Sequence, residues 1–105
     1  MRANRFAVAM DITDADLERF LVEWYGPRTR VQFIEETAGR LNDGAASVCA
    51  LGIQVRLLMA LAIPADDYAF GVFAAESAEA VAQLCADAGA PAERISTAVG
   101  WSRDC

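Results

Sequence analysis

The chemistry open to this sequence is limited by the residue types it contains. The chain has no histidine, and all nine of its basic residues are arginines. Histidine is the commonest general base and a frequent metal ligand, so its absence excludes most catalytic triads and imidazole metal sites. Any chemistry therefore has to come from carboxylates, arginines, tyrosines and cysteines.

Glu23 is the first candidate for a functional side chain, because it stands inside the apolar run RFLVEWY, residues 19–25. Enclosed among apolar neighbours, its carboxylate would lose its water and its pKa would rise, as a general base requires. The alternative is that Glu23 forms an ion pair with an arginine, such as Arg56, across an interface. Residue type and spacing leave both interpretations open.

Four more residues complete the candidate ligand-binding set: Tyr25, Arg56, Leu58 and Phe73. Arg56 is the one charged residue of the apolar run 55–63, and it either anchors an anionic group of a ligand or forms a salt bridge at an interface. Tyr25 either offers its hydroxyl to a ligand or packs at the end of its strand. Leu58 and Phe73 supply apolar surface.

Metal and nucleotide motifs are incomplete or absent. Asp11, Asp14 and Asp16 have the carboxylates of a cation loop but lack the glycine and the terminal glutamate of an EF-hand. They predict a solvated helix start, and we expect no metal site. No glycine-rich nucleotide loop occurs, and we expect no cofactor.

The cysteines and the net charge limit the cellular compartment and the classes of partner that we expect. Cys49, Cys85 and Cys105 are odd in number and far apart, unlike a disulfide framework or a metal motif, and they favour a reducing cytoplasm. A net charge of −6 opposes binding to nucleic acid or to an anionic membrane. No apolar run approaches the ~18 residues of a membrane span.

The elements that position these side chains are visible in the hydrophobic periodicity. The 105 residues suffice for one domain with one core. The pattern predicts a strand at 19–25, a helix at 29–51, strands at 55–63 and 68–75, a helix from Ser77 to about Ala88 and a strand at 94–101. Residues 1–18 form an N-terminal extension and residues 102–105 a tail. Within the extension, residues 1–9 are either not native or, from Asn4 to Met10, add a strand to a sheet edge or to a partner subunit.

The predicted order, β-α-β-β-α-β, is that of the ferredoxin-like α+β fold, expected here over residues 19–101. In this fold two helices cover one face of a four-stranded antiparallel sheet with strand order 4-1-3-2. The second face of the sheet has no helices on it.

Alternation and side-chain volume divide the strand residues between the two faces. We expect the bulkier set under the helices: Phe20, Val22, Trp24, Val55, Leu57, Met59, Leu61, Ile63, Phe70, Val72, Ile95 and Val99. We expect Glu23 on the uncovered face, together with Leu21, Tyr25, Leu58, Ala60, Ala62, Ala69, Gly71, Phe73, Ala98 and Gly100. Such an apolar face must meet another subunit, a ligand or both.

Two short segments carry a family resemblance. Residues 20–23 with Gly26 and Pro27, together with residues 88–95, resemble the opening strand and closing segment of a bacterial family of unknown function. That family is similar in fold to dimeric α/β-barrel proteins and includes an actinobacterial nickel-binding protein. The resemblance covers residues 19–99. The nickel-binding member has a histidine-bearing strand where this chain has RLLM, residues 56–59, so nickel binding does not carry over.

These observations favour a homodimer whose sheet faces enclose a small apolar molecule, contacted by Glu23, Tyr25 and Arg56. A second possibility is a cofactor-independent isomerase, cyclase or monooxygenase that acts on an aromatic or polyketide-like substrate with Glu23 as its base. That possibility depends on likeness of fold, which does not determine function. A third is a purely structural protein whose uncovered face is filled by a partner.

Overall fold

β2 (Glu18–Tyr25) is a central strand because every second side chain from Phe20 to Trp24 is apolar and buried. The computed structural model describes residues 17–26 and 31–100. In it β2 lies between β4 (Tyr68–Ala75) and β5 (Arg94–Ala98). β3 (Val55–Ile63) pairs with the other side of β4, so the sheet order is β3-β4-β2-β5 and all pairings are antiparallel. This is the predicted strand order.

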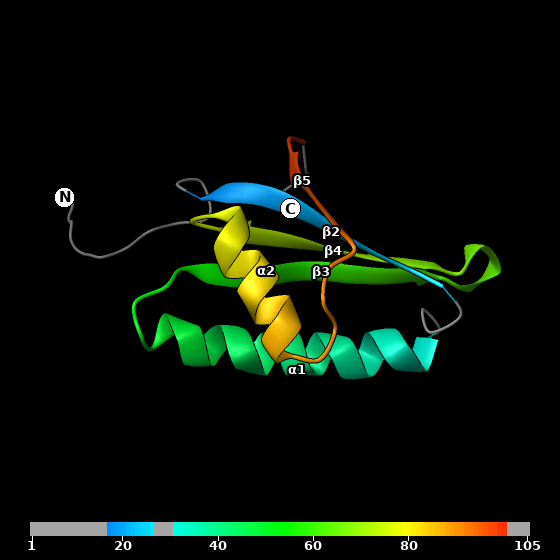
Figure 1. Cartoon of the computed structure of the whole chain (residues 1–105), viewed down its shortest axis with the longest axis horizontal. Helices are drawn as coiled ribbons and strands as arrows, with labels where there is room; N and C mark the ends of the chain where they lie inside the picture. Colours follow the sequence, from blue (N-terminus) through cyan, green and yellow to red (C-terminus); the bar gives the residue numbers. More distant parts are fainter. Residues whose placement is uncertain (1–16, 27–30, 101–105) are drawn as a thin grey trace, which may run out of the picture.

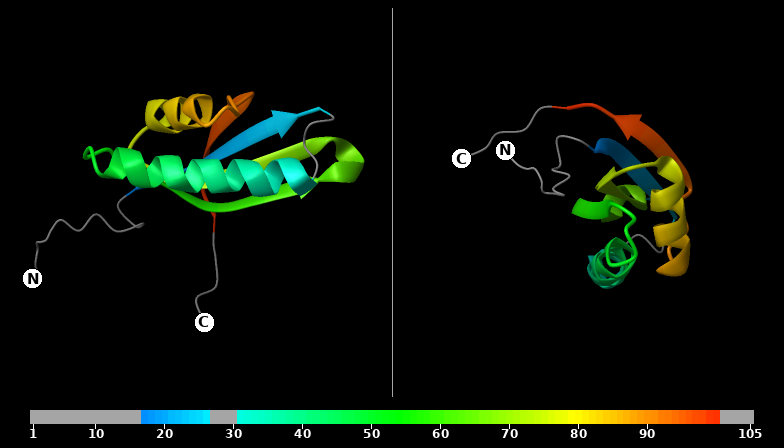
Figure 2. Two further views of the ribbon diagram at one scale, coloured as in Figure 1. Left: turned by 90° about the horizontal axis from the view of Figure 1, so that it is seen from below. Right: turned by 90° about the vertical axis from the view of Figure 1, so that its left-hand side faces the viewer.

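Two helices, α1 (Val31–Cys49) and α2 (Ala78–Asp87), pack on one face of the sheet (Figure 1). α1 lies along β3, and the shorter α2 contacts β4 and β5 (Figure 2). The element order is β-α-β-β-α-β, which confirms the ferredoxin-like α+β fold predicted from the sequence. Neither helix in the described part of the chain is both long enough and apolar enough to cross a membrane.

α2 begins directly after Ser77, as predicted, whereas α1 ends at Cys49, two residues before the predicted limit. The Ser77 hydroxyl accepts a hydrogen bond from the Ala80 N–H at 3.1 Å, which caps the start of α2. Gly52 follows the end of α1 with φ +93°, a conformation that favours glycine. β5 ends at Ala98, before the predicted limit at Trp101. Trp101, residues 1–16 of the predicted extension and the tail at 102–105 lie outside the described residues, and Glu18 of that extension begins β2.

The core between sheet and helices is built around Trp24. Its side chain is 1% exposed, and its indole N–H donates to the Ala90 carbonyl oxygen at 2.9 Å. That hydrogen bond ties the segment after α2 to the middle of the sheet. Where the helices meet, a Cβ on Gly44 would lie only 2.8 Å from Leu84 Cδ1, so glycine permits the close contact between α1 and α2.

The prediction for the faces of β4 is wrong. Phe73 is fully buried on the helix-covered face, where Ala69 and Gly71 accompany it, whereas the sequence analysis placed Phe70 and Val72 there. The reason is volume on the neighbouring strand. Trp24 lies opposite Ala69, and a Cβ on Gly71 would already lie 3.4 Å from the Trp24 ring. Small residues on β4 therefore make room for a large one on β2.

The prediction for β3 is right only for its first half. Val55 and Leu57 lie on the helix-covered face, as expected. Leu57 pairs with Phe73 and Met59 pairs with Val72, so Leu58 is an extra residue that forms a β-bulge.

One extra residue exchanges the two faces for the rest of the strand. Met59, Leu61 and Ile63 are 44%, 47% and 39% exposed on the uncovered face, contrary to the prediction. Ala60 and Ala62 take the helix-covered face, since they pair with Gly71 and Ala69.

Candidate functional site

The uncovered face of the sheet, called here the open face, is more apolar and more aromatic than the sequence analysis expected. The bulge and the register of β4 bring large side chains onto it from three strands. Its apolar members are Leu21, Tyr25, Met59, Leu61, Ile63, Tyr68, Phe70 and Val72. Such a surface, on a chain with 23% charged residues, is a candidate binding surface.

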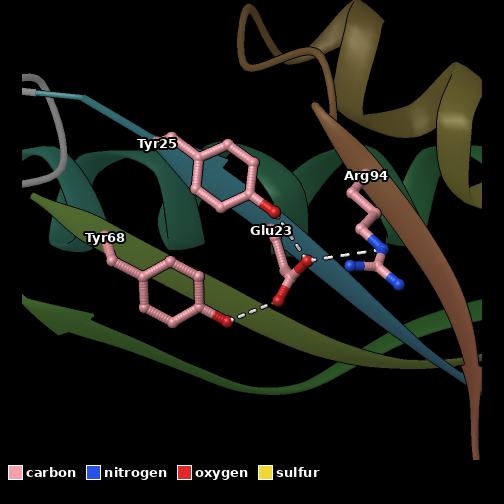
Figure 3. Close-up of polar contacts among 4 residues, drawn as sticks. All are labelled: Glu23, Tyr25, Tyr68 and Arg94. Atoms are coloured by element: carbon pink, nitrogen blue, oxygen red, sulfur yellow. Dashed lines mark hydrogen bonds and ion pairs between the residues drawn. The ribbon is translucent and has the colours of Figure 1, made fainter.

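Four polar residues converge on this face and form the Glu23 cluster (Figure 3). The Tyr25 hydroxyl donates to Glu23 Oε1 at 2.8 Å, and the Tyr68 hydroxyl donates to Glu23 Oε2 at 2.8 Å. Arg94 Nε lies 3.8 Å from Oε1, an ion-pair distance that is too long for a hydrogen bond. The Glu23 side chain is 15% exposed and that of Arg94 is 68% exposed. Each carboxylate oxygen therefore has its own phenol, and the arginine lies beside them.

The strand register explains why these residues meet. Tyr25 and Glu23 are two residues apart on β2 and so point to the same face. Tyr68 lies opposite Tyr25 on β4, and Arg94 lies opposite Glu23 on β5. The two tyrosine rings stack with centroids 5.8 Å apart, and the Tyr68 and Phe70 rings lie 5.9 Å apart. An aromatic row thus flanks the carboxylate.

Backbone contacts fix this end of β2. The Tyr25 N–H donates to Glu93 Oε2 at 3.2 Å, and the Glu93 N–H donates to the Glu23 carbonyl oxygen at 3.0 Å. The Gly26 N–H donates to the Asp67 carbonyl oxygen at 2.8 Å. The strand that carries Glu23 and Tyr25 is therefore held from both the residue before β5 and the β3–β4 turn.

The hydrogen bonds change the proton affinities in opposite directions. The Tyr68 hydroxyl, followed by that of Tyr25 and the Arg94 charge, lowers the pKa of Glu23, although burial acts against the shift. Burial and the bond to Glu23 raise the pKa of Tyr68 to about 12. The bond to Glu23 also raises the pKa of Tyr25. At neutral pH the cluster holds one carboxylate and two protonated phenols.

The structure brings only part of the predicted site together. Glu23 and Tyr25 lie in the cluster, but Arg56 does not, because it lies opposite Ala74, towards the other end of the sheet. Within the chain the arginine beside Glu23 is Arg94, and the pairing of Glu23 with Arg56 across an interface stays a prediction.

Two apolar members of the predicted site are misplaced. Phe73 is buried under the helices, on the opposite face of the sheet from Glu23. Leu58 is the bulge residue and lines a groove of about 470 Å³ between α1 and β3 with Ile34 and Ala38. Neither side chain contributes to the open face near the cluster.

Tyr68 and Arg94 are the members that the sequence analysis missed. A signal existed for Tyr68, since residues 64–67 predict a turn and Tyr68 is the first residue of the strand after it. Arg94 also starts its strand. Pairing these two strand starts with the end of β2 would have placed both beside Glu23.

Within residues 17–26 and 31–100, no group of three or more His, Cys, Asp or Glu side chains is placed to hold a metal ion. The cluster itself has one carboxylate, and both of its oxygens already accept hydrogen bonds. Its chemistry is that of hydrogen bonding and charge.

Comparison with known proteins supports the fold. No protein-family model and no curated protein sequence matches the chain. Among solved structures, the chain is similar to SCO4226 from Streptomyces coelicolor A3(2), with a TM-score of 0.62 and 20% sequence identity. The match covers 80% of this chain and 99% of that one. At this identity the likeness establishes a shared fold and says nothing of a shared activity.

Proposed function

We propose that this protein binds a small apolar molecule on its open face, at the Glu23 cluster, and that two copies of the chain enclose it. The observation that carries the proposal is an ionised carboxylate, held by two phenols, beside an exposed row of aromatic and aliphatic side chains. Binding sites commonly combine an apolar lining with a few fixed polar groups that orient the ligand.

The proton affinities favour binding over acid–base catalysis by Glu23. A general base works best when its pKa lies near the operating pH. The hydroxyls of Tyr68 and Tyr25 lower the pKa of Glu23, and the pKa of Tyr68 is raised to about 12. These shifts move the pKa of the acceptor and the pKa values of the donors further from neutral pH. The cluster is therefore better suited to binding a ligand than to transferring a proton.

A second copy is the proposed cover for the open face. Tyr25, Met59, Leu61 and Ile63 are each at least 39% exposed in the single chain. Burial of apolar surface contributes about 25 cal/mol per Å², so a second apolar sheet face is favoured over water as a neighbour. Cyclic dimers are the commonest homo-oligomers, and a two-fold axis would pair the same face of both copies.

The proposal retains a cytoplasmic location. Cys49 and Cys85 are free thiols among the described residues, and Cys85 is buried whereas Cys49 is half-buried. Burial raises the pKa of Cys85 to about 12, so its thiol is inert.

The test compares two leucine variants. Leu61 lies on the open face, whereas Leu51 lies in the turn after α1 and is 79% exposed. Light scattering measures the mass, and the fluorescence of the neutral apolar dye Nile red measures binding. We expect a dimer that binds the dye, loss of both properties in Leu61→Arg, and retention of both in Leu51→Arg.

Two results would contradict the proposal. If the native protein is a monomer at high concentration and does not bind the dye, the open face is neither an interface nor a binding surface. If Leu61→Arg behaves like Leu51→Arg, the dye and the partner use another surface.

A further inference from the structure

We infer that the Glu23 cluster selects organic cations: small molecules with an apolar or aromatic body and a protonated amine. This inference rests on the proposed function and specifies the ligand class for the same site. It follows from three properties of the cluster: its remaining hydrogen-bonding capacity, its charge and its aromatic surface.

The two phenols and the carboxylate of the cluster can still accept hydrogen bonds, but they have no proton left to donate. A phenol has one proton, and both Tyr25 and Tyr68 donate theirs to Glu23. What the phenols still offer is lone pairs on oxygen, and an ionised carboxylate has only acceptors. A polar group that meets these three side chains therefore has to donate hydrogen bonds, as an ammonium group does.

The charge around Glu23 is only partly compensated. Arg94 Nε lies 3.8 Å from the carboxylate, and the arginine side chain is 68% exposed, so water screens the pair. The chain as a whole carries a net charge of −6, which attracts cations at long range. An anionic ligand at Arg94 would instead lie close to the Glu23 carboxylate and be repelled by it.

The aromatic surface suits the same ligand. Stacked rings of Tyr25 and Tyr68 stand beside the carboxylate, and Phe70 extends the row (Figure 3 shows the two tyrosines). Aromatic faces attract cations through their quadrupole, and they bury the apolar body of a ligand. A carboxylate with flanking rings thus matches both ends of an arylalkylamine.

The test uses three probes that share a phenyl ring and a short chain: 2-phenylethylamine, 2-phenylethanol and 3-phenylpropanoate. Their affinities are measured at neutral pH and low salt by titration of backbone amide NMR signals. We expect the amine to bind about tenfold more tightly than the alcohol, the size of one charge-assisted hydrogen bond, and the acid to bind most weakly.

Three variants assign the effect to the cluster. Glu23→Gln should remove the preference for the amine and leave the affinity for the alcohol unchanged. Arg94→Gln should tighten amine binding severalfold, because it removes a competing cation, and its high exposure makes it a safe substitution for folding. Glu79→Gln, an exposed change of the same charge on α2, is the matched control and should change nothing.

The outcomes separate this inference from the proposed function. If Nile red binds to the open face but the amine and the alcohol bind equally, the ligand class is wrong and the binding function stands. If the acid binds most tightly, Arg94 is the anchor and the inference is overturned. If neither the dye nor any probe binds, the proposed function fails as well.

Discussion

Consecutive residues of β2 build two different kinds of polar contact on the two faces of the sheet. Trp24 points under the helices, where its single polar group donates to a backbone carbonyl, that of Ala90. Glu23 and Tyr25 point to the open face, where the Glu23 carboxylate accepts from the hydroxyls of Tyr25 and of Tyr68 on β4 and lies beside Arg94 on β5. The covered face uses a buried side-chain-to-backbone bond to hold elements together. The open face instead has bonds between side chains at the surface of the molecule.

The difference matters energetically. A buried polar atom that loses its partner bears the full cost of its lost hydration, whereas a partly exposed one regains water. Changes at Trp24 should therefore appear as lost stability. Changes in the Glu23 cluster should appear mainly in proton affinity and ligand binding.

The largest expected effect is at Trp24. Trp24→Ala should lower the free energy of unfolding by ~3–5 kcal/mol, because it empties the middle of the core. Trp24→Phe keeps a ring but leaves the Ala90 carbonyl unpaired, and it should cost ~1–3 kcal/mol. Urea unfolding followed by far-ultraviolet circular dichroism measures both values.

The neighbouring residue supplies the control for the two faces. Tyr25→Phe removes a polar atom from a residue that is 44% exposed, and it should lower the free energy of unfolding much less than Trp24→Phe does. Equal losses for Trp24→Phe and Tyr25→Phe would mean that the two faces do not differ in the way described.

The β-bulge allows a second test of the comparison within one strand. Leu57→Ala should cost ~2 kcal/mol or more, because Leu57 packs against the core. Leu61→Ala should cost less than about 1 kcal/mol in the monomer, because Leu61 lies beyond the bulge on the open face. The measurement is thermal unfolding at a concentration where light scattering shows single chains. Similar losses for both variants would mean that β3 has no bulge in solution.

The bulge also shows which part of the fold could not be predicted from the sequence. The elements followed from periodicity and from end signals such as Ser77, which are local properties. The faces of β3 and β4 depended on an extra residue at Leu58 and on the volume of Trp24 opposite Ala69, and neither is visible in one strand alone. Local patterns thus predicted the elements better than the orientation of their side chains.

The site was predicted in part for the same reason. Glu23 stood out because a carboxylate within an apolar strand needs a partner, and Tyr25 shares its face. Tyr68 and Arg94 are 45 and 71 positions away from Glu23 along the chain, and only the strand register brings them to it. Arg56 was chosen as partner by charge alone, and the same register takes it to the other end of the sheet.

A smaller effect is expected in the acid stability of Glu23→Gln. The folded pKa of Glu23 is lowered by Tyr68, Tyr25 and Arg94, so its contribution is present above the unfolded pKa and is lost as pH falls through the folded value. At neutral pH the variant should be less stable by about 1 kcal/mol, since glutamine keeps part of the hydrogen bonding. The difference should disappear as pH falls below about 4. Urea unfolding at several pH values measures it.

The control for acid stability is Glu35→Gln, which changes an exposed carboxylate on α1 beyond the first turn of the helix, where the helix dipole has little effect. Its unfolding free energy should follow that of the native protein at every pH. A Glu23→Gln variant whose deficit stays constant from neutral to acid pH would show that the carboxylate charge contributes nothing to folding.

The last prediction concerns the pH at which the two tyrosine hydroxyls ionise. This effect is the most specific to the Glu23 cluster, and it changes the stability at neutral pH the least. The chain has two tyrosines, and both donate to Glu23, so the ultraviolet absorbance of phenolate reports on the cluster alone. Their raised pKa values mean that the native protein should show less than half ionisation at pH ~10, where free tyrosine is half ionised. The stabilisation behind these shifts is present below that pH and is lost as pH rises through the folded values, about 12 for Tyr68.

Variants make the tyrosine titration decisive. Denatured protein gives the unshifted reference, and circular dichroism of the same samples verifies that the fold is intact at pH ~10. Glu23→Gln should move the native curve towards the reference, because it removes the charge that both hydroxyls face. In Tyr25→Phe the remaining tyrosine is Tyr68, and in Tyr68→Phe it is Tyr25. The phenolate absorbance of Tyr25→Phe should rise at a higher pH than that of Tyr68→Phe, since burial is the largest cause of the raised pKa of Tyr68. A native titration curve that coincides with the denatured one would show that the hydrogen-bonded Glu23 cluster does not form in solution. The contrast between the two faces of β2 would then be wrong.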